Sequence, residues 1–299
     1  MIVGGVLVGL VGLTSVILPY DQSFVGLNRL QIATLNPQIL PFMMHDRVTL
    51  AGMMLSLGLL YLQLAYHAIR KGQTWAMWVV IVSALIGFTS FFLFLGFGYF
   101  DPLHALVTLI LFFYFQCGLV TWLKERGYAT ASSLWRQLHH CVYRGCRSPA
   151  YLILLLSAFG VIVGGIVVAV LGDTTVFVPQ DITFLHTTPG NLYEINARLI
   201  PLIAHDRAGF GGALVSDGLG ILLTLLWAWR DGARWLWWTL VGAGIWAFLP
   251  TFAIHLLVGY TSLTHLAPAV GGSILYIVGL VLSYAFLHRG PLSREFVPY

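Results

Sequence analysis

Eight long runs of apolar residues dominate the chain, and each is close to the length that crosses a lipid bilayer. A helix rises about 1.5 Å per residue, so roughly 20 apolar residues span a hydrocarbon core of about 30 Å. The runs are continuous and lack the alternation of a barrel strand, so they predict helices. The predicted spans are about Ile2–Leu18, Val48–Ile69, Trp75–Phe97, Pro102–Leu123, Tyr151–Leu171, Ala208–Trp229, Trp235–Val258 and Leu263–Leu287.

The composition supports a membrane environment. The 299 residues are 59% hydrophobic and 9% charged, with a mean hydropathy of +0.87. Soluble domains carry about 45–50% apolar and about 25% charged residues, so a soluble globule could not cover its own surface here. With 3 Cys and 12 Pro, the chain is also no disulfide scaffold, collagen or disordered segment. We predict an all-α integral membrane protein whose surroundings are the lipid bilayer.

Basic residues predict the orientation of the spans. Under the positive-inside rule, the connections richer in Lys and Arg lie in the cytoplasm. This places both termini in the cytoplasm, most simply of a bacterial cytoplasmic membrane. The net charge of +4 then follows from topology, so no nucleic-acid partner is expected. The basic residues on the predicted inner side are Arg70, Lys71, Lys124, Arg126, Arg136, Arg144, Arg147, Arg230, Arg234, Arg289 and Arg294.

The two halves of the sequence look like copies of each other. A shift of 160 residues places His45-Asp46-Arg47 on His205-Asp206-Arg207, and the alignment needs no gap over residues 3–78. Four helices per copy give both copies the same orientation. We therefore predict two tandem four-helix bundles, at residues 1–123 and 151–299. Residues 124–150 would link them through an amphipathic helix on the cytoplasmic surface.

Duplicated histidines are the best candidates for chemistry. His45 and His104 are expected to begin the second and fourth helices of the first bundle, at equal depth near the outer face. Two imidazoles facing each other across a bundle can bind a b-type haem axially, and imidazole with carboxylate can bind another metal. The predicted ligand pairs are His45 with His104 and His205 with His265.

The charged residues of the two His-Asp-Arg triplets allow a functional and a structural interpretation. Arg47 and Arg207 could clamp haem propionates, and Asp46 and Asp206 could ligate a metal. Alternatively, Asp stabilises a helix N-terminus, Arg reaches lipid phosphates and His caps the helix. The duplication makes the two interpretations about equal.

The placement of these histidines resembles that in the heme A synthases. That family has eight helices in two four-helix bundles, with a histidine on the second and fourth helix of each bundle. It also has a His-Arg pair at the second-helix position, where this chain inserts an Asp in both copies. A glutamate of the family corresponds to Phe42 and Leu202 here, and residues 19–47 hold no Cys. The resemblance covers nearly the whole chain in topology and implies haem binding near the outer face.

Two further polar residues lie within predicted spans. Asp217 is a candidate for proton transfer, or for a hydrogen bond to a neighbouring helix. His255 lies at the level of His205 and His265, as a proton donor, a spare ligand or a capped interfacial histidine.

Three classes of function follow from these residues. The first is a haem-dependent membrane oxidoreductase or electron-transfer protein that acts with a quinone, another lipid-soluble substrate or a membrane redox partner. The second is a proton-coupled transporter or a lipid-binding membrane protein. The third is a non-catalytic subunit of a membrane complex.

Overall fold

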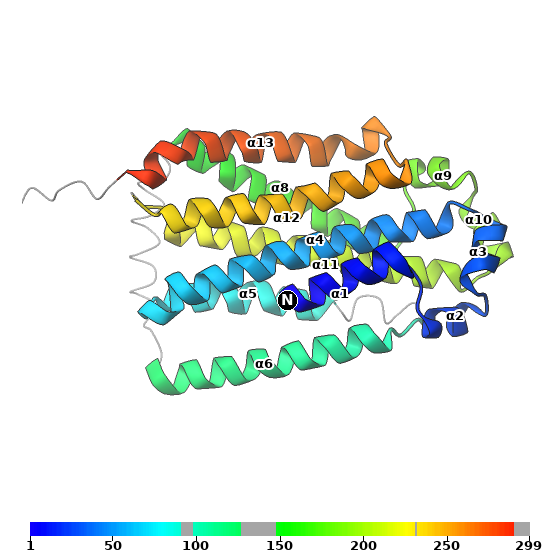
Figure 1. Cartoon of the computed structure of the whole chain (residues 1–299), viewed down its shortest axis with the longest axis horizontal. Coiled ribbons are helices and arrows are strands. Elements are labelled where there is room, and N and C mark those ends of the chain that lie inside the picture. The colour runs from blue at the N-terminus through cyan, green and yellow to red at the C-terminus, as the bar shows by residue number, and fades with distance from the viewer. Residues whose placement is uncertain (91–97, 127–147, 231, 290–299) are drawn as a thin grey trace, which may run out of the picture.

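The computed structural model describes residues 1–90, 98–126, 148–230 and 232–289 (Figure 1). All regular structure within these ranges is helical, which confirms the all-α prediction. The predicted amphipathic helix of the linker falls mostly in residues 127–147, outside the described residues.

Within the described residues, six helices are long and apolar enough to cross a membrane, which supports the predicted bilayer environment. Two predicted spans are shorter. The first, α1 (Ile2–Thr14), reaches membrane length only together with α2 (Pro19–Val25), across a bend of 58°. The other, α5 (Thr74–Ser90), has 17 residues and ends where the described range ends. The six long helices are α4 (Ile39–His67), α6 (Pro102–Arg126), α8 (Pro149–Asp173), α11 (Leu199–Ala228), α12 (Arg234–Val258) and α13 (Leu263–His288).

Two of these helices begin earlier than predicted. Helix α4 begins at Ile39 instead of Val48, and α11 begins at Leu199 instead of Ala208. Both His-Asp-Arg triplets therefore lie inside helices and do not mark helix entrances. The prediction began these spans after the charged residues, but a helix can include charges that are paired within the protein.

Short helices cover the end of the bundle where the triplets lie. They are α2, α3 (Arg29–Leu35), α9 (Pro179–Leu185) and α10 (Pro189–Ile195). Two side-chain amides connect these segments in reciprocal fashion. Asn36 donates to the carbonyl of Leu185, and Asn196 donates to the carbonyl of Val25, each over 2.8 Å. At the opposite end, a 3₁₀ turn (Ile69–Lys71) follows α4.

The helices of the two halves interleave. Helix α4 packs along α12 from the other half, and α11 packs along α5, while α4 and α11 also contact each other. The first two of these contacts are close at a glycine. A Cβ atom on Gly52 would lie 2.6 Å from the carbonyl oxygen of Trp246, and one on Gly212 would lie 2.1 Å from Cβ of Ser90. The two halves therefore share a helix interface that involves α4, α5, α11 and α12.

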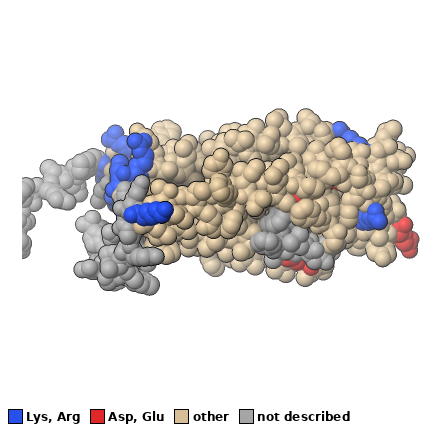
Figure 2. All heavy atoms as spheres, turned by 90° about the horizontal axis from the view of Figure 1, so that it is seen from below, with Lys and Arg blue, Asp and Glu red and all other residues tan. Residues whose placement is uncertain are grey.

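Helix α6 stands apart from this arrangement (Figure 1). Helix α13 packs along both α8 and α12, whereas α6 makes only sparse contacts with the other described helices. Most Lys and Arg side chains visible in Figure 2 gather at one end of the molecule, with charge-poor surface along the bundle. That end contains Arg70, Lys71, Arg230 and Arg234, as the sequence predicts for one side of a membrane.

Candidate functional site

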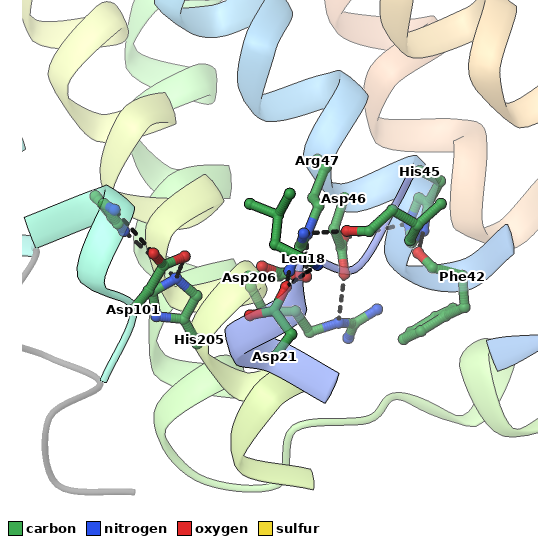
Figure 3. A network of polar contacts seen from close by, with 12 residues as sticks. Leu18, Asp21, Phe42, His45, Asp46, Arg47, Asp101, His205 and Asp206 are labelled. Carbon is green, nitrogen blue, oxygen red and sulfur yellow. Dashed lines mark hydrogen bonds and ion pairs between the residues drawn. The ribbon is translucent and has the colours of Figure 1, made fainter. Parts of the chain in front are cut away.

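The two His-Asp-Arg triplets form one buried polar network between α4 and α11 (Figure 3). Every residue of both triplets is at most 6% exposed. Burying charges is costly unless each one is paired, so the partners decide what the triplets do.

Each arginine pairs with the aspartate of the other triplet. Nε of Arg47 lies 2.9 Å from Oδ2 of Asp206, and Nε of Arg207 lies 3.5 Å from Oδ2 of Asp46. The charges of α4 are therefore balanced by those of α11. The sequence predicted that these arginines hold haem propionates. Carboxylates of the protein already contact both guanidinium groups, so a propionate would have to compete with them.

A second aspartate completes each arginine pair from the outer helices. Asp21 lies 3.6 Å from NH2 of Arg47, and Asp181 lies 2.6 Å from NH1 of Arg207. Burial alone would raise the pKa of Asp181, but the charge and hydrogen bonds of Arg207, with a hydrogen bond from Tyr260, hold this pKa below its ordinary value. Asp181 is therefore ionised at neutral pH.

The same arginines hold two strained backbone positions. Val16 and Val176 have φ angles of 61° and 62°, in the left-handed region that β-branched residues avoid. Arg47 donates to the carbonyl of Val16, and Arg207 donates to that of Val176. Such strain persists only where the surroundings fix it, and here the buried guanidinium groups do so.

The histidines pair across the halves and not within them. Nδ1 of His104 lies 3.4 Å from Nε2 of His205, and the ring of His45 lies 6.0 Å from that of His265, centroid to centroid. This corrects the predicted pairs, because His205 of α11 lies next to His104 of α6, and His45 of α4 lies near His265 of α13. The ion-pair network lies between the two histidine sites (Figure 3).

The close pair does not fit a haem held between its two rings. A macrocycle must separate its two axial imidazoles, whereas the His104 and His205 rings are in edge contact, with centroids 5.2 Å apart. We therefore do not place a haem between these two rings, and the b-type haem expected from the sequence stays a prediction.

The first histidine site contains a carboxylate that sequence reasoning did not select. Oδ2 of Asp101 lies 3.5 Å from Nε2 of His205, while Oδ1 accepts from the backbone N–H of His104 and from Tyr20. Burial would raise the pKa of Asp101, but the hydrogen bonds from His205, His104 and Tyr20 hold it below its ordinary value. The run Asp101-Pro102-Leu103-His104 is a helix N-cap pattern, and that pattern could have identified Asp101.

A cavity of about 450 Å³ opens beside this first site. Its polar end, at the histidines, consists of Tyr20, Arg47, Asp101, His104, His205 and Asp206. The rest of its wall is mainly apolar and comes from α1, α4, α5, α6 and α11. Polar side chains also occur in this wall, at Tyr61, Ser90, Thr108, Tyr114 and Ser216. These apolar residues include Leu7, Val8, Val11, Met53, Met54, Leu57, Val80, Phe88, Leu103, Val107, Leu111 and Phe115.

The second histidine site has a third imidazole in place of the carboxylate. His45, His255 and His265 each offer a ring nitrogen, and these atoms lie within 4.8 Å of one another. Phe42 is fully buried beside this site, with its ring 5.1 Å from that of His45 and 4.8 Å from the guanidinium carbon of Arg207. Each site thus contains two of the duplicated histidines. The third group is the carboxylate of Asp101 in the first site and the imidazole of His255 in the second.

Asp217 lies away from both histidine sites. It is 1% exposed, and Ser56 Oγ lies 3.0 Å from each of its carboxylate oxygens across the contact between α4 and α11. This is the interhelical hydrogen bond that the sequence offered as one interpretation. A role in proton transfer stays a prediction.

No family model, curated protein or solved structure matches this chain, so its function must be argued from its own residues.

Proposed function

We propose that the protein binds a quinone-type molecule in the cavity beside His104 and His205. The observation that carries this proposal is the division of the cavity into a small polar end and a long apolar wall. Ligand sites of roughly 300–1,000 Å³ are mostly apolar, with a few polar groups that orient the ligand. A lipid-soluble molecule with a hydrogen-bonding head group and an apolar tail matches this division.

The polar end suits the oxygen atoms of a quinone ring. Imidazole nitrogens donate or accept hydrogen bonds, and Oδ2 of Asp101 lies 3.5 Å from Nε2 of His205. His104 and His205 would contact the head group, and Asp101 would orient the ring of His205. The oxidoreductase and electron-transfer roles predicted from the sequence would depend on this occupant. We further propose that the basic end of the bundle faces the cytoplasm.

Binding of a short-chain quinone to detergent-purified protein tests the proposal. Val107 lines the cavity from α6, so Val107→Trp should fill the apolar wall and abolish saturable binding in calorimetric titration. The neighbouring Leu106 is 53% exposed, which makes Leu106→Trp the matched control that should bind as the wild type does. His104→Ala should weaken binding about 3- to 10-fold, through one lost hydrogen bond.

Three outcomes would contradict the proposal. One is unchanged binding in Val107→Trp. Another is equal affinity for an alkyl chain that lacks the quinone head group, which would favour a general lipid-binding protein. The third is a Soret band in the wild type that disappears in His205→Ala, which would favour the predicted haem.

A further inference from the structure

We propose that His45, His255 and His265 form a binding site for a divalent transition-metal ion, independent of the cavity beside His104. The three imidazoles come from α4, α12 and α13, and their candidate ligand atoms lie within 4.8 Å of one another. His45 and His255 are 3% and 4% exposed, whereas His265 is partly exposed, so two of the three ligands are buried in the protein.

The backbone fixes which ring nitrogen faces the centre in two of the histidines. Nδ1 of His45 contacts the carbonyl oxygen of Phe42, and Nδ1 of His255 lies 2.7 Å from that of Thr251. A carbonyl oxygen only accepts, so each Nδ1 carries the proton, and a neutral ring then leaves Nε2 as a bare acceptor. Histidines that bind metals use this arrangement, with the second ring nitrogen donating to a carbonyl or carboxylate.

Acceptor atoms then face each other without enough protons between them. Nε2 of His255 lies 3.2 Å from Nε2 of His265, and Nε2 of His45 lies 3.4 Å from the carboxylate oxygen Oδ1 of Asp46. A proton on Nε2 of His265 can serve the contact with His255, but the contact between His45 and Asp46 still lacks a donor. A cation at the centre would satisfy three imidazole lone pairs together, and the charge of Asp46 would lie next to it.

The ligand set indicates the class of metal. Neutral imidazoles suit Zn²⁺, Cu²⁺, Ni²⁺ and Fe²⁺, whereas Mg²⁺ and Ca²⁺ prefer oxygen. Three protein ligands leave a fourth position for water or another molecule, as in catalytic zinc sites. The ring of Tyr260 stacks on that of His265 at 4.1 Å and fixes its plane.

The sequence copies support a specific site. The alignment of the two copies pairs His45 with His205 and His104 with His265. It pairs His255 with no histidine, because the corresponding positions of the first copy are Phe94 and Leu95. The other histidine site has Asp101 as its third group, where the corresponding residue is Ser262. The three-imidazole cluster is thus a property of the second site alone.

Cobalt binding tests this proposal without any assumption about activity. Purified full-length protein, stripped with a chelator, should bind a single Co²⁺ per chain and develop visible ligand-field bands, which Zn²⁺ then removes. His255→Ala and His265→Ala should each lose these bands. His104→Ala, which deletes a histidine from the other site, should keep them.

Measurements on the wild-type protein can overturn the proposal even without the variants. Failure of the stripped protein to bind Co²⁺ or Zn²⁺ would show that the three histidines share protons only. Bands of equal intensity in His255→Ala, or their equal loss in His104→Ala, would place the metal elsewhere. Size-exclusion elution of each metal-free variant separates a lost ligand from a lost fold.

Discussion

At the scale of residues, the buried charges form a closed set in which each arginine depends on the other half of the chain. Arg47 contacts Asp206 and Asp21, while Arg207 contacts Asp46 and Asp181. Asp21 also accepts hydrogen bonds from the backbone of Leu18 and from Tyr99, so its charge has several partners. Asp206 has fewer, which makes it the group that most needs Arg47.

Removal of Arg47 should therefore destabilise the protein strongly. Arg47→Met leaves the carboxylate of Asp206 buried without its cation, and such losses cost about 3–5 kcal/mol. Thermal unfolding in detergent should show a large decrease in midpoint temperature. The double variant Arg47→Met with Asp206→Leu should recover part of that decrease, since no unpaired charge remains at this contact.

The control for this prediction is an arginine at the surface. Arg29 donates to the carbonyl of Thr14 in an exposed contact, so Arg29→Met should change stability by about 0.5 kcal/mol or less. A double variant that is no more stable than Arg47→Met would show that Asp206 does not depend on Arg47.

Sequence reasoning identified both triplets and all four duplicated histidines, but it assigned them the wrong neighbours. A duplication shows which residues are equivalent, but it does not show which copy supplies the partner. Asp101 and His255 differ between the copies, and the alignment therefore gave them little weight. In the structure they are the groups that distinguish the two sites.

At the scale of elements, close helix contacts position the triplets. Helix α4 reaches α12 at Gly52, where a Cβ atom would lie 2.6 Å from a backbone oxygen. A backbone atom cannot move aside as a flexible side chain can, so a larger residue must push the helices apart. That displacement would reach His45 on α4 and His255 on α12.

Gly52→Ala should consequently destabilise the fold by about 1–3 kcal/mol, the usual cost of overpacking. Gly118 provides the matched control, because a Cβ atom at that position of α6 would meet no atom within 4 Å. Gly118→Ala should be neutral or slightly stabilising, since alanine favours a helix. Thermal unfolding of the two variants side by side measures the difference, and equal midpoints would argue against close packing of α4 on α12.

The apolar runs predicted the long helices well, because burial in lipid or protein requires the same continuous hydrophobicity. The starts of α4 and α11 were missed because the charged pairs Asp46-Arg47 and Asp206-Arg207 lie within their first three turns. The short outer helices were also missed, although Pro19, Pro179 and Pro189 stand at the first turns of α2, α9 and α10, where proline is favoured. Asn28 and Gln31 similarly form a capping box on α3.

At the scale of the whole molecule, the interleaving of the two halves could not be predicted from the sequence pattern. A hydropathy pattern indicates that a helix is buried, but it does not indicate which other helix packs against it. In lipid, association depends on close packing and on polar contacts between helices. Here Gly52 and Gly212 supply the packing, and the reciprocal bonds of Asn36 and Asn196 supply polar contacts between the halves.

This arrangement predicts that neither half is stable alone. A chain that ends within residues 127–147 would keep α4 but lose α12 and α11, which leaves Arg47 without Asp206 and Asp46 without Arg207. The complementary chain loses the same partners in reverse. Each half expressed alone should aggregate or be degraded, whereas co-expressed halves should co-purify through a tag on one of them. Monodisperse, heat-stable halves obtained separately would instead support two self-contained bundles, and would contradict the exchange of helices that brings His104 to His205 and His45 to His265.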